Sequence, residues 1–208
     1  MTVTRVLPVD PWNPDPAALE EAGARVRRGG LVAFPTETFY GLGSNATDTA
    51  AVARVFAVKG RPESKPLLAL VDSVEMVQSL ALEVSAVSQR FMSAYWPGPL
   101  TLIFKARPEV PGALTAGTGT MGIRMPGHPV AQGLVRAAGT PVTAPSANLS
   151  GGEPPTTAQA VRNAFEGAID LILDGGPTKG GLPSTILDVS VMPPQLVRRG
   201  AVRVTELE

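Results

Sequence analysis

The stretch Gly29–Gly43 reads GGLVAFPTETFYGLG, and it indicates the class of fold that the rest of the chain supports. Its apolar run Leu31–Phe34 is typical of a strand that is buried on both faces, although a piece of buried helix has the same pattern. Pro35 removes a ladder donor and is expected to end this strand. The hydrogen-bonding side chains of Thr36–Thr38 then follow the strand's carboxyl end, which is the edge where open α/β sheets bind ligands. Taken alone, the stretch also fits a solvated Pro/Gly loop.

Helical and strand patterns alternate along the remaining sequence. Helices are predicted over residues 15–28, 49–58, 74–82, 84–96, 129–138 and 158–165. Strands are predicted over residues 31–34, 66–71, 100–104, 123–125, 141–143, 169–173, 184–189 and 195–198. Strands that alternate with helices predict an α/β fold, and the two consecutive late strands predict a mixed sheet. No linker or repeat interrupts the pattern, so one domain over residues 1–208 is expected.

The composition argues against several classes of protein. Lys and Arg total 18, as do Asp and Glu, so the net charge is zero and no strongly basic footprint indicates nucleic acid. The absence of cysteine excludes disulfides, thiolate catalysis and cysteine-based zinc sites, and the single histidine leaves no histidine cluster for a metal. No apolar run approaches the roughly 20 residues of a membrane span, and the first residues lack a signal-peptide pattern. A cytoplasmic location away from membranes is therefore expected.

The sequence contains neither of the common nucleotide-binding motifs in the context that each requires. The chain contains no Gly-Lys dipeptide, which excludes a Walker A loop. The segment Gly117–Gly122 matches GxGxxG, but it precedes a predicted strand instead of opening a helix. Any nucleotide site must therefore be built in another way.

Cationic side chains gather at two other places. Lys59, Arg61 and Lys65 lie within seven residues on a Gly/Pro-constrained turn and can converge on phosphate or carboxylate oxygens. The alternative is an ordinary cationic helix C-terminus, which is the simpler reading of Lys59 alone. Arg124 lies on a short predicted strand between glycine and proline, where a bidentate carboxylate clamp and a strand-edge ion pair are equally compatible with the pattern.

Small polar side chains follow two later strands. The segment 143–151, TAPSANLSG, can hydrogen-bond a ligand without adding bulk, and an ordinary polar turn is the alternative. Ser184 opens a strand directly after a Gly-rich loop, and Arg198 ends the last predicted strand with further cationic donors. His128 immediately precedes a predicted helix, which indicates a capping or surface residue, and it is assigned no functional role.

Six segments, FPTETFYGLG, KGRP, GIRMP, PSANLSG, PSTI and VRRG, in this order and spacing, resemble the YrdC/TsaC family of threonylcarbamoyl-AMP synthases. The similarity covers residues 24–202. It implies a twisted, mixed α/β sheet with a large cationic cleft. It also implies a nucleotidyltransferase that condenses L-threonine, bicarbonate and ATP, with Mg²⁺ accompanying the nucleotide, into threonylcarbamoyl-AMP and pyrophosphate. The product would pass to a tRNA threonylcarbamoyl-transferase complex.

The resemblance also assigns site residues. Threonine would be bound by Thr38, Arg124, Ala144 and Ser184. ATP and the carbonate would be held by Lys59, Arg61, Lys65, Thr120, Ser146, Asn148 and Arg198, with Lys59 and Arg61 as catalytic cations and no metal ligands. Fixed cations and small donors suit the charge that develops on the α-phosphate and on the leaving pyrophosphate.

The sequence departs from longer family members at two places. Leu70 stands where those members often carry histidine, and because the sequence stops at Glu208, resemblance to the short form of the family, without the C-terminal extension, is expected. The sequence indicates no general base for the threonine amine, so bicarbonate and solvent both stay open. Two alternative functions are a carbamoyl-transferring relative, as in hydrogenase maturation proteins, and an RNA-binding module.

Overall fold

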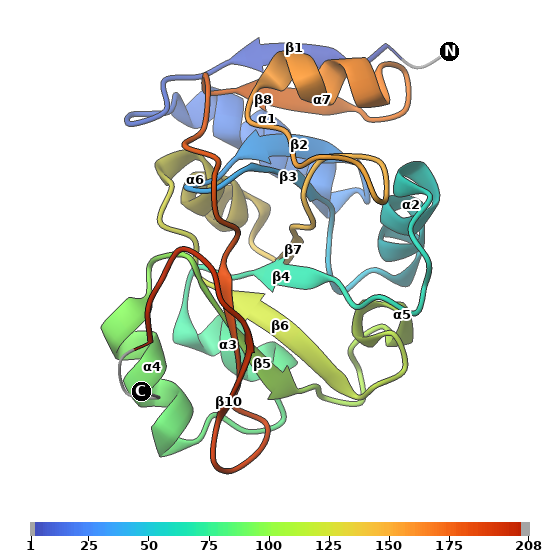
Figure 1. Ribbon diagram of the computed structural model, residues 1–208. Coiled ribbons are helices and arrows are strands. Elements are labelled where there is room, and N and C mark those ends of the chain that lie inside the picture. Colours follow the sequence, from blue (N-terminus) through green and yellow to red (C-terminus); the bar gives the residue numbers. More distant parts are fainter. Residues whose placement is uncertain (1–2, 205–208) are drawn as a thin grey trace.

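The computed structural model describes residues 3–204, and residues 1–2 and 205–208, the ends of the predicted domain, lie outside that range. Its strands form two mixed sheets, one of four strands and one of six, which lie one above the other in Figure 1. In order across the four-stranded sheet, the strands are β1 (Arg5–Pro8), β8 (Leu171–Asp174), β2 (Val32–Pro35) and β3 (Tyr40–Gly43). Strands β1, β8 and β2 are parallel, and β3 returns antiparallel to β2. The predicted mixed α/β architecture is confirmed.

The six-stranded sheet carries the later strands. In order, these are β10 (Gln195–Arg198), β9 (Thr185–Asp188), β5 (Leu100–Lys105), β6 (Thr120–Arg124), β4 (Leu68–Leu70) and β7 (Val142–Thr143). Isolated bridges from Gly41 to Ser146 and from Asn45 to Val142 connect the hairpin strand β3 with the segment around β7. These bridges hold β3 beside the β7 edge of the six-stranded sheet.

Helices cover both sheets. They are α1 (Pro16–Arg27), α2 (Thr49–Lys59), α3 (Val74–Leu80), α4 (Ala86–Tyr95), α5 (Gly112–Thr115), α6 (Pro129–Ala138) and α7 (Ala158–Phe165). In Figure 1, α7 lies in front of the four-stranded sheet, whereas α1 and α6 lie behind it and pack on each other. Asp15 and Asp48 accept hydrogen bonds from the first-turn amides of α1 and α2 and so cap both helices. Among the described residues, no helix has the length and apolar character needed to cross a membrane.

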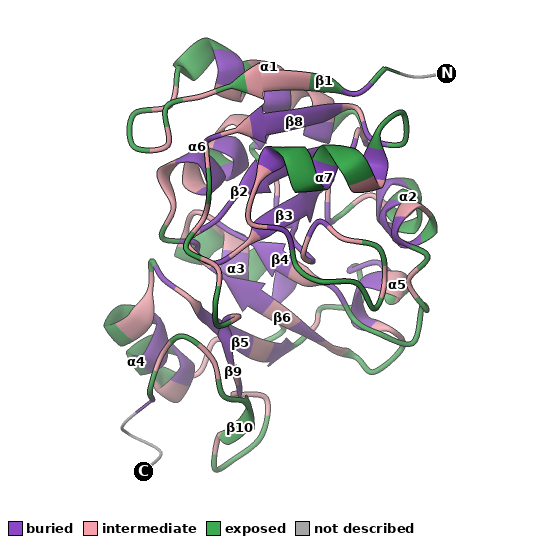
Figure 2. Cartoon of the chain, turned by 45° about the horizontal axis from the view of Figure 1, so that its top comes forward, coloured by how far each residue is buried: buried purple, intermediate pink, exposed green. Residues whose placement is uncertain are grey.

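The core explains why the sequence folds around β2. All residues of β2 and β3 are buried, and Figure 2 shows both strands in the interior. Phe34 and Leu70 belong to a cluster with Val130 and Leu134 of α6, whereas the larger cluster contains residues of both sheets, among them Ala33 and Leu102. Leu70 is therefore a core residue.

Three elements differ from the sequence-based expectation. Residues 40–43, expected as part of a loop, form β3. A Cβ at Gly43 would lie 2.7 Å from the Phe34 ring and clash with it, and a Cβ at Gly41 would make a tight contact of 3.2 Å with the same ring. The segment before the strand predicted over 123–125 contains the single turn α5, and β6 begins at Thr120, before the expected residue 123. Strand β1 has no predicted counterpart, because this short edge strand is only half-buried and shows no alternation.

Candidate functional site

A cavity of about 410 Å³ opens between the two sheets, within the range of small-molecule sites. The turn that joins β2 to β3 forms one wall, and strands β4, β5, β6 and β9 form the other. Three arginines line it, Arg61, Arg124 and Arg198, together with hydroxyl and apolar side chains and with no acidic residue among the lining set. The cavity is therefore suited to an anionic ligand.

Hydrogen bonds hold the turn between β2 and β3. The Thr36 amide and hydroxyl both donate to the Phe39 carbonyl, at 3.2 Å and 2.7 Å, and the Thr36 and Thr38 hydroxyls lie 3.1 Å apart. The Gly180 amide donates to the Thr38 carbonyl at 2.9 Å, which attaches the turn to the Gly-rich loop after β8. Thr36 and Thr38 thus present preorganised hydroxyls to the cavity.

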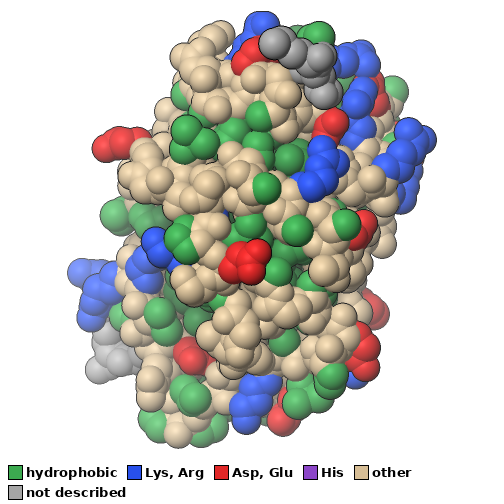
Figure 3. Space-filling view, turned by 90° about the vertical axis from the view of Figure 1, so that its right-hand side faces the viewer, with side chains coloured by type: hydrophobic (Ala, Val, Ile, Leu, Met, Phe, Trp, Pro, Cys, Tyr) green, Lys and Arg blue, Asp and Glu red, His purple; other side chains and the backbone are tan. Residues whose placement is uncertain are grey.

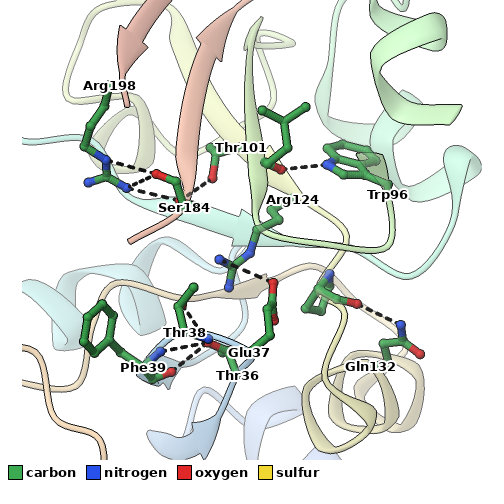
Figure 4. Close-up of polar contacts among 12 residues, drawn as sticks. Thr36, Glu37, Thr38, Phe39, Trp96, Thr101, Arg124, Gln132, Ser184 and Arg198 are labelled. Atoms are coloured by element: carbon green, nitrogen blue, oxygen red, sulfur yellow. Dashed lines mark hydrogen bonds and ion pairs between the residues drawn. The ribbon is translucent and has the colours of Figure 1, made fainter. Parts of the chain in front are cut away.

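Arg124 lies at the centre of the site. Arg124 pairs with Leu70 in the register of β6 and β4, and only 3% of the arginine residue is exposed. Figure 4 shows its guanidinium between the Thr36–Thr38 turn and the Ser184 segment. Burial lowers the pKa of Arg124, and the nearby Glu37 carboxylate, 3.8 Å from Nη1, opposes that shift. Because arginine stays charged in proteins, Arg124 is a buried cation, and its ion pair with Glu37 is too long for a hydrogen bond.

A second arginine is fixed on the opposite side. Arg198 donates to the Ser184 carbonyl from Nε and Nη2, at 3.1 Å and 2.8 Å, and to the Ser184 hydroxyl at 3.1 Å. That hydroxyl lies 2.9 Å from the Thr101 hydroxyl (Figure 4). Burial and the charge of Arg124 lower the pKa of Arg198, which indicates that the two guanidinium groups share one electrostatic environment.

The three cationic residues at and after the end of α2 lie in three different environments. Arg61 lines the cavity and donates to the Lys65 and Pro66 carbonyls at 3.2 Å and 2.8 Å. Lys59 is 2% exposed, and its ammonium donates to the Ser146 and Asn148 carbonyls at 2.6 Å and 2.5 Å. Burial and, secondarily, the charge of Arg61 lower the pKa of Lys59 to about 8. Lys59 therefore fixes the 146–148 loop in this structure, whereas Lys65 is exposed.

Comparison with known proteins places the chain in a family. A family model described as "Telomere recombination", that of the Sua5, YciO and YrdC proteins, matches residues 24–200. The chain belongs to the Sua5/YciO/YrdC family. The family resemblance of the sequence motifs is confirmed.

Individual relatives support the assignment. The chain is 44% identical over 187 residues to the threonylcarbamoyl-AMP synthase of Pyrococcus abyssi, covering 90% of this chain and 55% of that protein. The chain spans about half the length of the first curated relatives it matches. It is also similar to the crystal structure of P. abyssi Sua5 complexed with L-threonine, with 41% identity, a TM-score of 0.94, and coverage of 98% of this chain and 60% of that one. E. coli YciO is similar over 97% of this chain and 98% of its own, with 30% identity and a TM-score of 0.87.

The structure brings together most of the residues that the sequence singled out in this Sua5/YciO/YrdC protein. The predicted residues that line the cavity are Thr38, Arg61, Arg124, Ala144, Ser146, Ser184 and Arg198. Lys59, Lys65, Thr120 and Asn148 are not in the lining. Thr120 lies at the start of β6. The side-chain amide of Asn148 donates within its own loop, to the carbonyls of Leu149 and Gly152. The binding roles of all these residues stay predictions.

Sequence reasoning gave no specific role to several lining residues, notably Thr36, Phe39 and Thr101. Thr36 lies within the opening motif and could have been found there. Thr101 carries no motif, because only the β5–β9 pairing of Leu100 with Thr185 places it beside Ser184. His128 accepts a hydrogen bond from the Val130 amide through Nδ1 at 3.2 Å and caps α6, as predicted.

The donor set does not resemble a metal site. No carboxylate lines the cavity, and no group of three or more His, Cys, Asp or Glu residues within 3–204 could hold a metal ion. Mg²⁺ is ordinarily held by carboxylates together with substrate phosphates. The residues present therefore do not form a Mg²⁺ site of their own.

Proposed function

We propose that this protein is an L-threonylcarbamoyladenylate synthase that condenses L-threonine, bicarbonate and ATP. Membership of the Sua5/YciO/YrdC family and likeness to a Sua5 structure complexed with L-threonine support the proposal. The observation that carries it is the buried Arg124 in a cavity lined by hydroxyls and further arginines. A carboxylate ligand would supply the charge and the acceptors that this arginine lacks.

In the proposed complex, threonine lies between the turn and β6. Arg124 binds its carboxylate with two donors, because a guanidinium matches the geometry of a carboxylate. Thr38 and Ser184 provide hydroxyls within the same lining, and Ala144 leaves space where a larger side chain would intrude. These are the four residues that the sequence assigned to threonine.

ATP and the carbonate occupy the cationic remainder of the cavity. Arg61, Arg198 and Ser146 line it and can stabilise negative charge on the phosphates. Lys59 acts on this subsite through the loop that it holds, and Asn148 belongs to that loop. Lys65 and Thr120 are proposed to reach the nucleotide from the rim. Mg²⁺ enters as the counter-ion of ATP, as part of that substrate, since the lining offers it no carboxylate.

The order of bond formation follows from the chemistry. The threonine nitrogen first bonds to the carbon of bicarbonate, with loss of water and of an amine proton, and so acquires a carboxyl group. An oxygen of this carbamate then attacks the α-phosphate, and the bond to the bridging oxygen of the β-phosphate breaks to release pyrophosphate. No carboxylate or histidine lines the cavity, so bicarbonate or solvent accepts the proton in this proposal.

The product is a mixed anhydride, which must be consumed by transfer of its threonylcarbamoyl group. We propose hand-over to a tRNA threonylcarbamoyl-transferase complex, in the cytoplasm. Direct RNA binding is less well supported. On the face that carries α2 and α5, Figure 3 shows basic side chains mainly at the margins, with acidic and hydrophobic ones at the centre. The net charge of zero agrees with this distribution.

The proposal is tested by amino-acid selectivity. L-threonine should bind about 10- to 200-fold more tightly than L-serine, because the two differ by one methyl group and this is the range that one methyl supplies. Calorimetric titration of both amino acids in the presence of ATP measures the ratio. Equal affinity for the two, or no binding of threonine, would remove threonine from the proposed function.

A further inference from the structure

Arg124 and Glu37 form a buried pair of opposite charge in which no hydrogen bond joins the two side chains. Their nearest atoms, Nη1 and Oε1, are 3.8 Å apart, which is too long for a hydrogen bond. Arg124 Nε and both Glu37 carboxylate oxygens are buried and make no hydrogen bond within residues 3–204. Arginine–carboxylate pairs ordinarily close to about 2.7–2.9 Å. The pair is therefore electrostatic, and Nε of Arg124 is left without a hydrogen bond.

Hydrogen bonds hold the backbone on both sides of this pair. Glu37 belongs to the turn in which the Thr36 hydroxyl binds the Phe39 carbonyl at 2.7 Å. Arg124 belongs to β6, where its carbonyl accepts the Val71 amide at 3.0 Å. Closing the pair through the backbone would require the turn or a central strand to move.

Glu37 acts through the arginine. The cavity lining includes Thr36, Thr38 and Arg124 but does not include Glu37. In Figure 4 the Glu37 carboxylate extends from the turn to the Arg124 guanidinium. It thus compensates part of the charge of Arg124 without occupying the donors that a ligand would use.

This arrangement affects anions according to their charge. Coulomb energy scales with the product of the charges, so Glu37 opposes a dianion near Arg124 about twice as strongly as a monoanion. An amino acid is a zwitterion, and its ammonium group is attracted to Glu37. We propose that Glu37 is a positioning and selectivity residue that adapts the Arg124 subsite to the single charge of an amino-acid carboxylate and disfavours doubly charged anions. The inference rests on the proposed function only in taking threonine as that amino acid.

The test compares sulfate with L-threonine on Glu37→Gln, which keeps the side-chain shape and removes the charge. Calorimetry should show that sulfate binds at least about tenfold more tightly to the variant than to the wild-type protein, whereas L-threonine affinity changes less than about threefold. Glu37→Asp keeps the charge but moves it away from Arg124 by one methylene. Sulfate should therefore bind this variant only about two- to threefold more tightly than it binds the wild-type protein. Glu109→Gln, which removes a charge from an exposed loop, should change neither affinity.

A structural role alone would weaken both ligands or neither and would not change their ratio. An unchanged sulfate-to-threonine ratio in Glu37→Gln overturns the inference. If that variant does not fold, an unchanged ratio in Glu37→Asp overturns it equally. If the wild-type protein does not bind threonine, the proposed function fails, and the direct sulfate titrations still decide the role of Glu37.

Discussion

Replacing Arg124 with alanine should weaken L-threonine binding by about 2–4 kcal/mol, or about 30- to 700-fold in Kd. The reason is that Arg124 is 3% exposed, its Nε makes no hydrogen bond within residues 3–204, and its Nη1 lies 3.8 Å from the Glu37 carboxylate. Its donors are thus not consumed internally, and their loss removes a charge-assisted bidentate contact. Calorimetry with L-threonine gives the change directly, and thermal unfolding of the same sample shows whether the fold persists.

Arg124→Lys is the matched control for charge. Lysine keeps the positive charge opposite Glu37 but lacks the planar fork of arginine. The affinity of the Arg124→Lys protein for threonine should therefore lie between those of the wild-type protein and Arg124→Ala. Unchanged threonine affinity in a folded Arg124→Ala protein would remove the carboxylate clamp from the account. The arginine would then be only the partner of a buried ion pair.

Gly200→Ala should lower the free energy of unfolding by about 3 kcal/mol and also weaken threonine binding. An added Cβ would lie 2.6 Å from both the carbonyl carbon and the carbonyl oxygen of Ser184, and it would also clash with the Pro183 carbonyl. These neighbours are backbone atoms that cannot rotate away. Ser184 lines the cavity and accepts the hydrogen bonds of Arg198, so relief of the clash must disturb the site.

Gly112→Ala is the matched control for this substitution. Gly112 lies in α5 without a positive φ, and an added Cβ would meet no atom within 4 Å. Its effect on the free energy of unfolding should stay within about 1 kcal/mol and should be stabilising if present. Urea denaturation of both variants measures the difference. Equal stabilities would show that the backbone around Ser184 yields at little cost.

The elements that the sequence predicted are those whose signal is local. The run at 31–34 identified a buried strand because all its residues face the interior, and the helices predicted over 15–28 and 49–58 correspond to α1 and α2. Strand β3 was not predicted because its glycines are typical of loops. In the structure, glycine suits these two positions because the Phe34 ring lies close to them across the hairpin, which is a tertiary contact. The same limit applies to β1, an edge strand with little burial.

The site shows the same division. The motifs identified Arg61, Arg124, Ser184 and Arg198, which the fold brings into one cavity. Spacing along the chain could not show that the Lys59 ammonium is directed to the carbonyls of the 146–148 loop, because that contact joins segments 87 or more residues apart. Nor could it show that Glu37 meets Arg124 at a distance too long to close. Both facts depend on how the sheets are placed relative to each other.

Pyrophosphate release from ATP, measured with each substrate omitted in turn in carbonate-depleted buffer, tests the proposed synthase activity most directly. The carbamate must form before an oxygen nucleophile exists, so release should require L-threonine and bicarbonate together. Cleavage should fall between the α- and β-phosphates and leave the adenylate as the second product. Pyrophosphate release that persists without threonine, or formation of ADP and orthophosphate, would contradict the assignment.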